Sequence, residues 1–431
     1  MPKPPLLLAI GAFLALLTPA ASAAAADYVP GEIVVKYEDG GRARVHEIRD
    51  GDSVRETIAE LRSNPSVEYA VPNHIARASQ TLVPNDPGFR RQWNLREPWG
   101  IGMPEAWSLA EAAGAPGGEG ALVAVLDSGV AFERYKQYRR APDLRKRTFV
   151  RGYDFIDRDR HPNDVFGHGT HVAGTIAQAT NNGEGAAGIA YGARIMPLRV
   201  LDSAGSGDSL AIAKAIRYAA RRKADVINLS LEFELDVVPS EIPEILAAIR
   251  FANRRGTLIV GAAGNGFGRK VAYPAAADHV IAVGATTRSG CRSDYSNRGP
   301  ELDLVAPGGG VDAEPRSQQE LDLCEPNSAS DWIFQETFRG RGVQDFGMPR
   351  GYEGTSMAAP HVSAIAALVI ATGKLGPDPS PDAVQAHIQA TARDLGRPGV
   401  DGRYGSGLVD AAAALRCPPA TACPPAPAPA P

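Results

Sequence analysis

Three short segments of the sequence combine residue types that can do chemistry together. Asp127 directly follows an apolar run at residues 122–126, and a charge in such a place needs a partner. His168 lies between two glycines, which leave room for another group to approach its ring. Ser356 opens an apolar helical segment, whose start offers unpaired N–H groups and the positive end of the helix dipole. Taken singly, Asp127 and Ser356 would be ordinary caps, but together the three residues can form a base-activated serine nucleophile.

The histidine segment also has a metal interpretation. His168 and His171 are three residues apart on a predicted helix start, which suggests zinc at first sight. Metalloprotease helices of the His-Glu-x-x-His type place the two histidines four apart with a glutamate between them, so the pattern here argues against zinc. Helix-packing residues follow His171, and we expect it to be structural.

The elements around these segments predict an α/β fold. Apolar, strand-like runs alternate with segments of helical periodicity, and this alternation is typical of a mostly parallel sheet covered by helices on both faces. The predicted strands are residues 122–126, 195–200, 226–231, 258–261 and 280–285, and the predicted helices between them are residues 209–222 and 242–253.

A separate small α+β module precedes this body. Residues 32–37 alternate like a strand, residues 53–61 form an amphipathic helical pattern, and residues 67–78 resemble a second strand. A polar, turn-rich stretch at residues 79–87 follows. The expected organisation is therefore a leader at residues 1–23, a small module at 24–80, the main domain at 81–416 and a Pro/Ala-rich tail at 417–431.

Composition and the N-terminus bear on location and partners. The 431 residues include 45 Lys and Arg and 49 Asp and Glu, a formal charge of −4, and this lack of a basic surplus argues against nucleic acid as a partner. Lys3, the apolar run at residues 6–17 and the small residues 21–23 predict a secretory signal peptide. The run is shorter than the roughly 20 residues of a membrane-spanning helix. We expect a secreted protein, extracellular or periplasmic, and a monomer.

The cysteines are consistent with export. Cys291, Cys324, Cys417 and Cys423 allow three fully paired connectivities, and free buried thiols are the alternative. Because Cys417 and Cys423 are near neighbours in the tail, a local bridge between them, which leaves Cys291 with Cys324, is the simplest pairing.

The chain order Asp127, His168, Ser356 is one of the recognised orders of a serine-hydrolase triad. With the three motifs in this order and residues 261–265 (Gly-Ala-Ala-Gly-Asn) between the second and third, residues 85–415 resemble the subtilisin-like serine peptidases, the subtilases, most closely their thermitase-like branch. The resemblance implies a three-layer fold with Ser356 as nucleophile, His168 as general base and Asp127 as its orienting partner. It also implies that Asn265 and the Ser356 N–H stabilise the oxyanion.

Two other functions use the same residues. An α/β-hydrolase esterase would place its serine first in the chain within Gly-x-Ser-x-Gly, and residues 354–358 lack the second glycine. A catalytically dead relative that only binds peptides would usually lack a triad or oxyanion residue, and none is missing here. We therefore expect a secreted serine endopeptidase.

The resemblance further implies a precursor and a substrate cleft. The 24–80 module is similar to the family's inhibitory propeptide, although only one helix is readable, and self-cleavage is expected between Ala76 and Val83. The substrate-binding residues implied are Ser230, Leu231, Ala262, Ala263, Gly264 and Ala272. These small or apolar walls predict an uncharged side chain before the scissile bond. Where the family commonly has two glycines, this chain has Glu232 and Phe233, which puts the outer subsites in doubt.

Thermitase-like subtilases also bind calcium where the start of the mature chain meets a loop in the histidine helix. The matching residues are Asp86, Asp143 and the loop at residues 179–186. Two carboxylates, the Asn182 amide oxygen and the carbonyls of Ala179, Glu184 and Ala186 would give an all-oxygen shell of about six, as calcium prefers. A polar turn with two surface aspartates is the alternative.

Overall fold

The structure, a computed structural model, describes residues 28–48, 53–74, 81–96, 98–145, 148–315, 320, 324, 326, 331–340 and 342–418. The chain forms two compact units, Met1–Ser79 and Gln80–Pro431. The expected signal peptide, Cys423 and the Pro/Ala-rich end of the tail lie outside the described residues.

The first unit is a small α+β module. An antiparallel three-stranded sheet with the order β2-β1-β3 carries one helix, and its elements are β1 (Tyr28–Tyr37), β2 (Arg44–Glu47), α1 (Val54–Ser63) and β3 (Val67–His74). Ile58 of α1 packs on Ile33, Val35 and Ala70, which are all buried. The predicted strands and helix are therefore confirmed for the described residues, while residues 75–78 of the second predicted strand lie outside them. Within the described part of this unit, α1 is the single helix.

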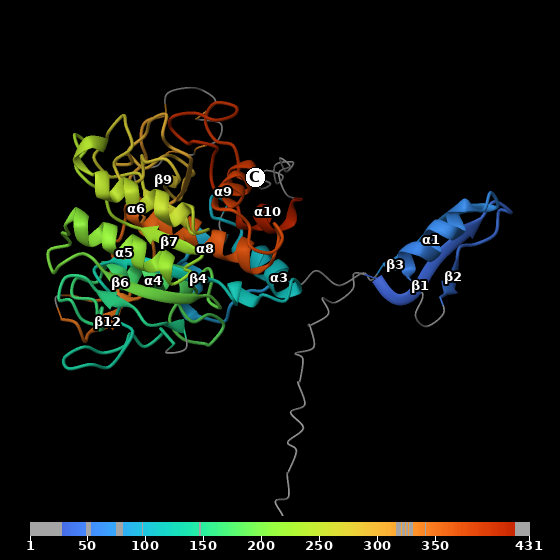
Figure 1. Cartoon of the computed structure of the whole chain (residues 1–431), viewed down its shortest axis with the longest axis horizontal. Helices are drawn as coiled ribbons and strands as arrows, with labels where there is room; N and C mark the ends of the chain where they lie inside the picture. The colour runs from blue at the N-terminus through green and yellow to red at the C-terminus, as the bar shows by residue number, and fades with distance from the viewer. Residues whose placement is uncertain are drawn as a thin grey trace, which may run out of the picture. The chain divides into compact units, whose positions relative to one another are not determined.

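The second unit is built on a seven-stranded sheet with the order β10-β9-β8-β7-β4-β6-β5. Figure 1 labels β4, β6, β7 and β9 of this sheet. All neighbouring strands in it are parallel. The strands are β4 (Leu122–Asp127), β5 (Tyr153–Asp154), β6 (Arg194–Arg199), β7 (Val226–Leu229), β8 (Leu258–Ala262), β9 (Val280–Thr286) and β10 (Leu304–Pro307). The α/β class with a mostly parallel sheet is confirmed.

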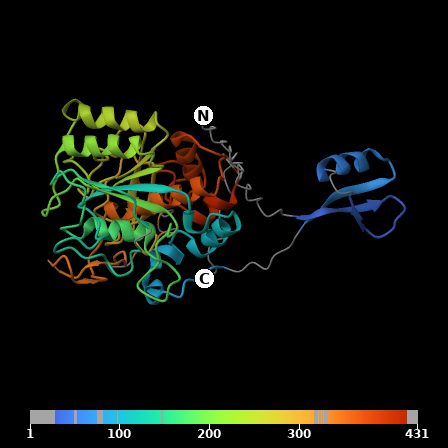
Figure 2. The same ribbon diagram turned by 60° about the horizontal axis from the view of Figure 1, so that its bottom comes forward.

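Helices cover both faces of this sheet, because its strands are apolar on both sides. In β4, Val123 and Val125 belong to one core cluster with residues of α4 (His168–Ala177) and α8 (Thr355–Ala371). Ala124 and Leu126 point the other way, into a cluster with α5 (Ser209–Arg221) and α6 (Pro243–Asn253). Figure 2 shows α5 and α6 side by side on one side of the sheet and α4 on the other.

Shorter elements complete the unit. They are η1 (Pro87–Arg91), α2 (Trp93–Arg96), α3 (Met103–Ala112), η2 (Pro116–Gly118), η4 (Pro239–Glu241), β11 (Thr337–Phe338), β12 (Phe346–Gly347), α9 (Pro381–Ala390) and α10 (Ala411–Arg416). Within the described ranges, no helix is both long enough and apolar enough to cross a membrane.

The disulfide pattern follows the simplest pairing. Cys291 and Cys324 are joined, with their Cα atoms 4.7 Å apart, so this predicted bridge is confirmed. Cys417 is also disulfide-bonded. Its expected partner, Cys423, is one of the residues that the structure does not describe.

Candidate active site

The candidate site lies where the strand order of the large sheet reverses. The chain passes from β4 out to β5, returns to β6 beside β4, and then continues to β7 on the opposite side of β4. Asp127 is the last residue of β4, and Ser230 directly follows β7. The carboxyl ends of two neighbouring parallel strands thus open a crevice at a topological switch point, the usual place for a site in such sheets.

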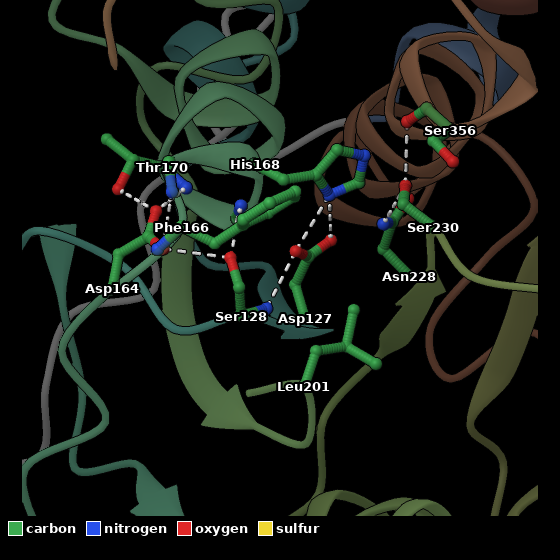
Figure 3. A network of polar contacts seen from close by, with 12 residues as sticks. Asp127, Ser128, Asp164, Phe166, His168, Thr170, Leu201, Asn228, Ser230 and Ser356 are labelled. Carbon is green, nitrogen blue, oxygen red and sulfur yellow. Dashed lines mark hydrogen bonds and ion pairs between the residues drawn. The ribbon is translucent and has the colours of Figure 1, made fainter. Parts of the chain in front are cut away.

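Asp127 and His168 form the first polar contact of the site. Nδ1 of His168 lies 2.8 Å from Oδ1 and 2.9 Å from Oδ2 of Asp127 (Figure 3). Asp127 has no exposed surface, and its Oδ1 also accepts a hydrogen bond of 2.7 Å from the Ser128 N–H. An ionised carboxylate only accepts, so Nδ1 carries the proton and Nε2 keeps a free lone pair.

The electrostatics favour a basic imidazole. Burial lowers the pKa of His168, but the charge of Asp127, its hydrogen bond and the charge of Asp164 outweigh burial and raise this pKa above its usual value. The second ring nitrogen faces the side on which Ser356 lies (Figure 3). His168 and Ser356 line the same cleft, which has a volume of about 420 Å³.

Asp164 holds the segment that presents His168, a role that the sequence did not reveal. Its Oδ1 accepts from the Ser128 hydroxyl and from the N–H groups of Phe166 and Gly167, at 2.8 to 2.9 Å. Its Oδ2 accepts from N and Oγ1 of Thr170, at 2.9 and 2.6 Å. Although burial raises the pKa of Asp164, these five donors satisfy both of its oxygens. The only sequence signal is an acidic residue placed shortly before a helix start.

Ser356 is held at the start of α8 by neighbours in β7 and α8. Gly354 precedes the helix with a φ of 144°, which a residue with a Cβ rarely adopts. The hydroxyl of Ser230 donates to the Ser356 carbonyl at 2.8 Å and accepts from Asn228 Nδ2 at 2.9 Å. Oδ1 of Asn228 in turn accepts from Ser363 Oγ at 2.9 Å, which ties β7 to α8.

The amide of Asn265 is fixed at its oxygen end. Oδ1 accepts from the Thr355 N–H at 2.8 Å and from Thr355 Oγ1 at 3.1 Å. Because a backbone N–H can only donate, this contact assigns the oxygen and directs Nδ2 to the opposite side. Asn265 follows β8 and therefore lies beside the residue that precedes Ser356.

The residues expected to form the apolar wall next to the scissile bond have an acidic neighbour. Leu231, Ala262, Ala263 and Ala272 are buried, but the carboxylate of Glu232 lies against Gly264 and Asn265. A Cβ built on Gly264 would lie 2.1 Å from Oε2 of Glu232 and 3.0 Å from Cβ of Ala272. The sequence suggested only an effect on outer subsites, because the direction of the Glu232 side chain depends on donors supplied by Asn265.

The predicted calcium residues converge in a second polar region. Oδ2 and Oδ1 of Asp86 accept from the N–H groups of Asn181 and Asn182, at 2.7 and 3.1 Å. Asp143 accepts from Asn182 Nδ2 at 2.8 Å and from the Ala186 N–H at 3.2 Å. The Ala179 N–H donates to the Asp143 carbonyl, and the Glu184 N–H donates to Asn182 Oδ1. The Asn182 amide thus turns its nitrogen, and not its oxygen, toward Asp143.

The electrostatics of this region favour a cation. Burial raises the pKa of Asp143 to about 6, and Asp86 adds to the effect. Glu336, which accepts from the Asp143 N–H at 3.0 Å, has its pKa raised to about 7 by burial and by the charges of Asp143 and Glu184. Buried carboxylates whose charges act on one another suit a hard cation with oxygen ligands. No group of three or more His, Cys, Asp or Glu side chains in the described part of the chain is arranged as a metal site.

His171 has the structural environment expected for it. Its Nε2 donates to the Ile333 carbonyl at 3.0 Å, and its ring stacks on Tyr352 at 4.3 Å between centroids. Burial lowers the pKa of His171 to about 3. The ring is thus a neutral core group.

Comparisons with known proteins agree with this geometry. Residues 118–407 match the model of the subtilase family. The chain is 32% identical over 400 residues to a thermophilic serine proteinase of Bacillus sp. (strain AK1), covering 88% of this chain and 86% of that protein. It is 35% identical to thermitase of Thermoactinomyces vulgaris, covering 72% of this chain and 91% of thermitase.

A solved structure shows the same fold. The structure of a protease from Pseudoalteromonas arctica PAMC 21717 superposes with a TM-score of 0.63 at 32% identity, covering 78% of this chain and 99% of that one. The family match extends over more than half of the sequence. The chain therefore belongs to the subtilase family and is a serine-type endopeptidase that acts on protein or peptide substrates.

Proposed function

We propose that this chain is a secreted, self-processing precursor of an endopeptidase that works through Asp127, His168 and Ser356 and an acyl-enzyme. The observation that carries the proposal is the contact of His168 Nδ1 with both oxygens of Asp127, in a cleft that Ser356 also lines. This contact fixes the tautomer that leaves Nε2 free to accept a proton.

The proposed reaction has two halves. Nε2 of His168 takes the Ser356 hydroxyl proton while Oγ attacks the scissile carbonyl, and the imidazolium then gives this proton to the leaving amine. Water next attacks the acyl-enzyme: His168 accepts a proton from it and returns that proton to Oγ as the acid product leaves. Asp127 stays ionised throughout and stabilises the imidazolium.

Asn265 and the Ser356 N–H would bind the tetrahedral oxyanion. The Thr355 contacts hold the Asn265 oxygen, so Nδ2 is available as a donor. The Ser356 N–H lies in the first turn of α8, where no preceding turn accepts it. Loss of such an amide donor costs on the order of 10² to 10³ in kcat, a value taken from subtilisin.

The precursor is proposed to comprise a signal peptide at residues 1–23, an inhibitory propeptide at 24–80, the catalytic domain at 81–416 and a tail at 417–431. The compact antiparallel module with one helix supports the propeptide, because it has its own buried cluster. Such a unit can dock on the enzyme as a folded inhibitor before its removal.

Structural calcium is general among subtilases, and we propose that this chain binds it at Asp86, Asp143 and the 179–186 loop. The carboxylates of Asp86 and Asp143 would provide charge, Asn182 would turn its oxygen inward, and the carbonyls of Ala179, Glu184 and Ala186 would complete the shell. Calcium would neutralise the mutual repulsion of Asp143 and its neighbours and hold residue 86 on the loop. It would take no part in the reaction.

An active-serine phosphonate probe and casein digestion together test the catalytic proposal. We expect the wild-type enzyme to be labelled at Ser356 and to digest casein, and Ser356→Ala to do neither. The Ser356→Ala precursor should also remain uncleaved between Ala76 and Val83, because self-processing uses the same nucleophile. Maturation of this variant in the absence of other proteases would refute self-processing, labelling without proteolysis would indicate an esterase, and peptide binding without labelling would indicate an inactive relative.

A further inference from the structure

Glu232 brings a carboxylate to the wall of the substrate cleft. It occupies the first of two positions at which the family commonly has glycine. Its Oε2 accepts from the Asn265 N–H at 2.9 Å, and its Oε1 accepts from Asn265 Nδ2 at 3.2 Å. The same Asn265 accepts from Thr355, which precedes Ser356 in the chain. Glu232 is therefore linked to the nucleophile segment through a single intervening side chain.

The carboxylate lies against Gly264, one of the residues expected to line the pocket for the side chain before the scissile bond. Oε2 lies so close to Gly264 that any side chain at position 264 would collide with it. Cβ of Ala272 borders the same point, at 3.0 Å from the Cβ position built on Gly264. The pocket wall formed by Gly264 and Ala272 is thus apolar along its sides and acidic where Glu232 meets it.

In the described part of the chain, no basic group balances this charge. Among the described residues, none forms an ion pair with Glu232, and those lining the cleft include Glu232 and Glu234 but no lysine or arginine. Partial burial raises the pKa of Glu232, and Glu234 adds to the effect, although the Asn265 donors oppose it. The side chain remains exposed to solvent, so a substrate can reach it.

The contact between Glu232 and Asn265 leaves one Asn265 donor available for catalysis. The Nδ2 group has two N–H donors, of which Glu232 uses one, so the other remains for the oxyanion. The carboxylate and Thr355 hold the amide at opposite ends, which favours a fixed donor direction. An acidic pocket and a working oxyanion site are therefore compatible.

From this geometry we infer that Glu232 makes the endopeptidase prefer arginine or lysine immediately before the scissile bond. The inference rests on the proposed function and names its substrate class. The methylenes of a long basic side chain would pack on Gly264 and Ala272 while its charged end pairs with Glu232. An apolar side chain of similar length would cover the carboxylate without offering it a partner, which is unfavourable.

The chain itself has a suitable bond where self-processing is expected. Arg77 is the only lysine or arginine between Ala76 and Val83, a stretch whose residues 76–80 lie outside the described part of the structure. We therefore expect the matured chain to begin at Ala78. A purified precursor that matured on its own to a different N-terminus would contradict this specificity.

The decisive test compares peptides that differ only in the residue before the cut: arginine, lysine or methionine. With wild-type enzyme matured from the full chain, we expect kcat/KM for arginine and lysine to exceed that for methionine by about tenfold or more, as for a desolvated charge pair at a binding site. Glu232→Gln should abolish most of this preference, because glutamine keeps an oxygen for Asn265 but carries no charge to pair with arginine or lysine.

Glu234→Gln is the matched control, since it removes the same charge two residues along the chain. The measured ratio is kcat/KM for the arginine peptide divided by kcat/KM for the methionine peptide. We expect the reduction of this ratio in Glu234→Gln to be less than half of the reduction in Glu232→Gln. A wild-type preference for methionine, an unchanged ratio in Glu232→Gln, equal losses on all peptides, or an equal effect of Glu234→Gln would each overturn the inference. Failure of the proposed function is distinct, because the wild-type enzyme would then cleave none of the peptides and would not react with the phosphonate probe.

Discussion

Two groups of buried carboxylates in the large unit differ in the charges that surround them. Asp127 and Asp164 are completely buried, yet each meets donors from its own chain: the His168 ring and Ser128 N–H for Asp127, and five N–H or O–H donors for Asp164. Asp143 and Glu336 are almost as buried, and Asp143 also accepts hydrogen bonds from Gln178, Asn182 and the Ala186 N–H. Burial and neighbouring carboxylates nevertheless raise their pKa values to about 6 and about 7.

The difference shows that the partner, and not burial alone, decides what a buried carboxylate does. Donors from the chain keep Asp127 and Asp164 in place without outside help, which suits residues that must orient a base before any substrate arrives. Asp143 and Glu336 lack a compensating positive charge among the described residues, so an external cation can stabilise them. The first group is thus expected to govern rate, and the second to govern stability.

The largest expected effect is a loss of catalytic rate on substitution of Asp127 that substitution of Asp143 does not cause. Asp127→Asn should lower kcat by about 10⁴, the magnitude known for the triad aspartate of a serine protease, because the wrong imidazole tautomer is then favoured. Asp143→Asn should leave the initial rate on a short peptide within about threefold while lowering thermal stability. Initial rates and melting curves of both variants check this, and equal losses of rate would refute the division.

Chelation tests the second group directly. Removal of calcium should lower the melting temperature by several degrees, since a ligand at about a hundred times its Kd stabilises a fold by about 2.7 kcal/mol. Initial activity on a small peptide should stay nearly unchanged, but autolysis should be faster. Asp86→Ala should no longer respond to calcium. Unaltered melting after exhaustive chelation, or an Asp86→Ala variant that responds like the parent, would contradict the site.

The smallest effect is a shift along the pH axis. Since His168 acts as a base only when neutral, kcat/KM should fall as pH decreases through its pKa, which the charge of Asp127 and its hydrogen bond raise despite burial. The acid-side midpoint should therefore lie above about 6.5, the usual value for histidine. The residual activity of Asp127→Asn should have its acid-side midpoint at a lower pH than that of the wild-type enzyme. Glu336→Gln, assayed with calcium, should keep the wild-type midpoint. Equal shifts in both variants would argue against a specific role of Asp127.

Local patterns in the sequence predicted the main strands and the helices α5 and α6, because buried parallel strands are continuous apolar runs and both helices are amphipathic. The short strand β5, with two residues, has too few side chains to show a period. The grouping of Asp127, His168 and Ser356 followed from their residue types and chain order, and the family resemblance then implied the role of each. By contrast, the contact of Glu336 with Asp143 joins residues 193 positions apart, and no local pattern reports such a contact.

Glu232 shows the same limit at the candidate site. Its position after a buried strand was readable, but its direction is decided by Asn265, 33 residues away. A glutamate next to a solvent-exposed cleft could equally have pointed outward. Only the folded arrangement of β7 and β8 brings the two donors of Asn265 to its carboxylate.

The Cys291–Cys324 bridge has a consequence for an enzyme that is surrounded by copies of itself. The bridge joins two cysteines that are 33 positions apart in the sequence, so one cut anywhere between them leaves both pieces covalently joined. Such a nicked molecule would migrate as one species on a non-reducing gel and as two after reduction. When one copy of the enzyme cuts another copy between these cysteines, the first cut therefore releases no fragment of the chain.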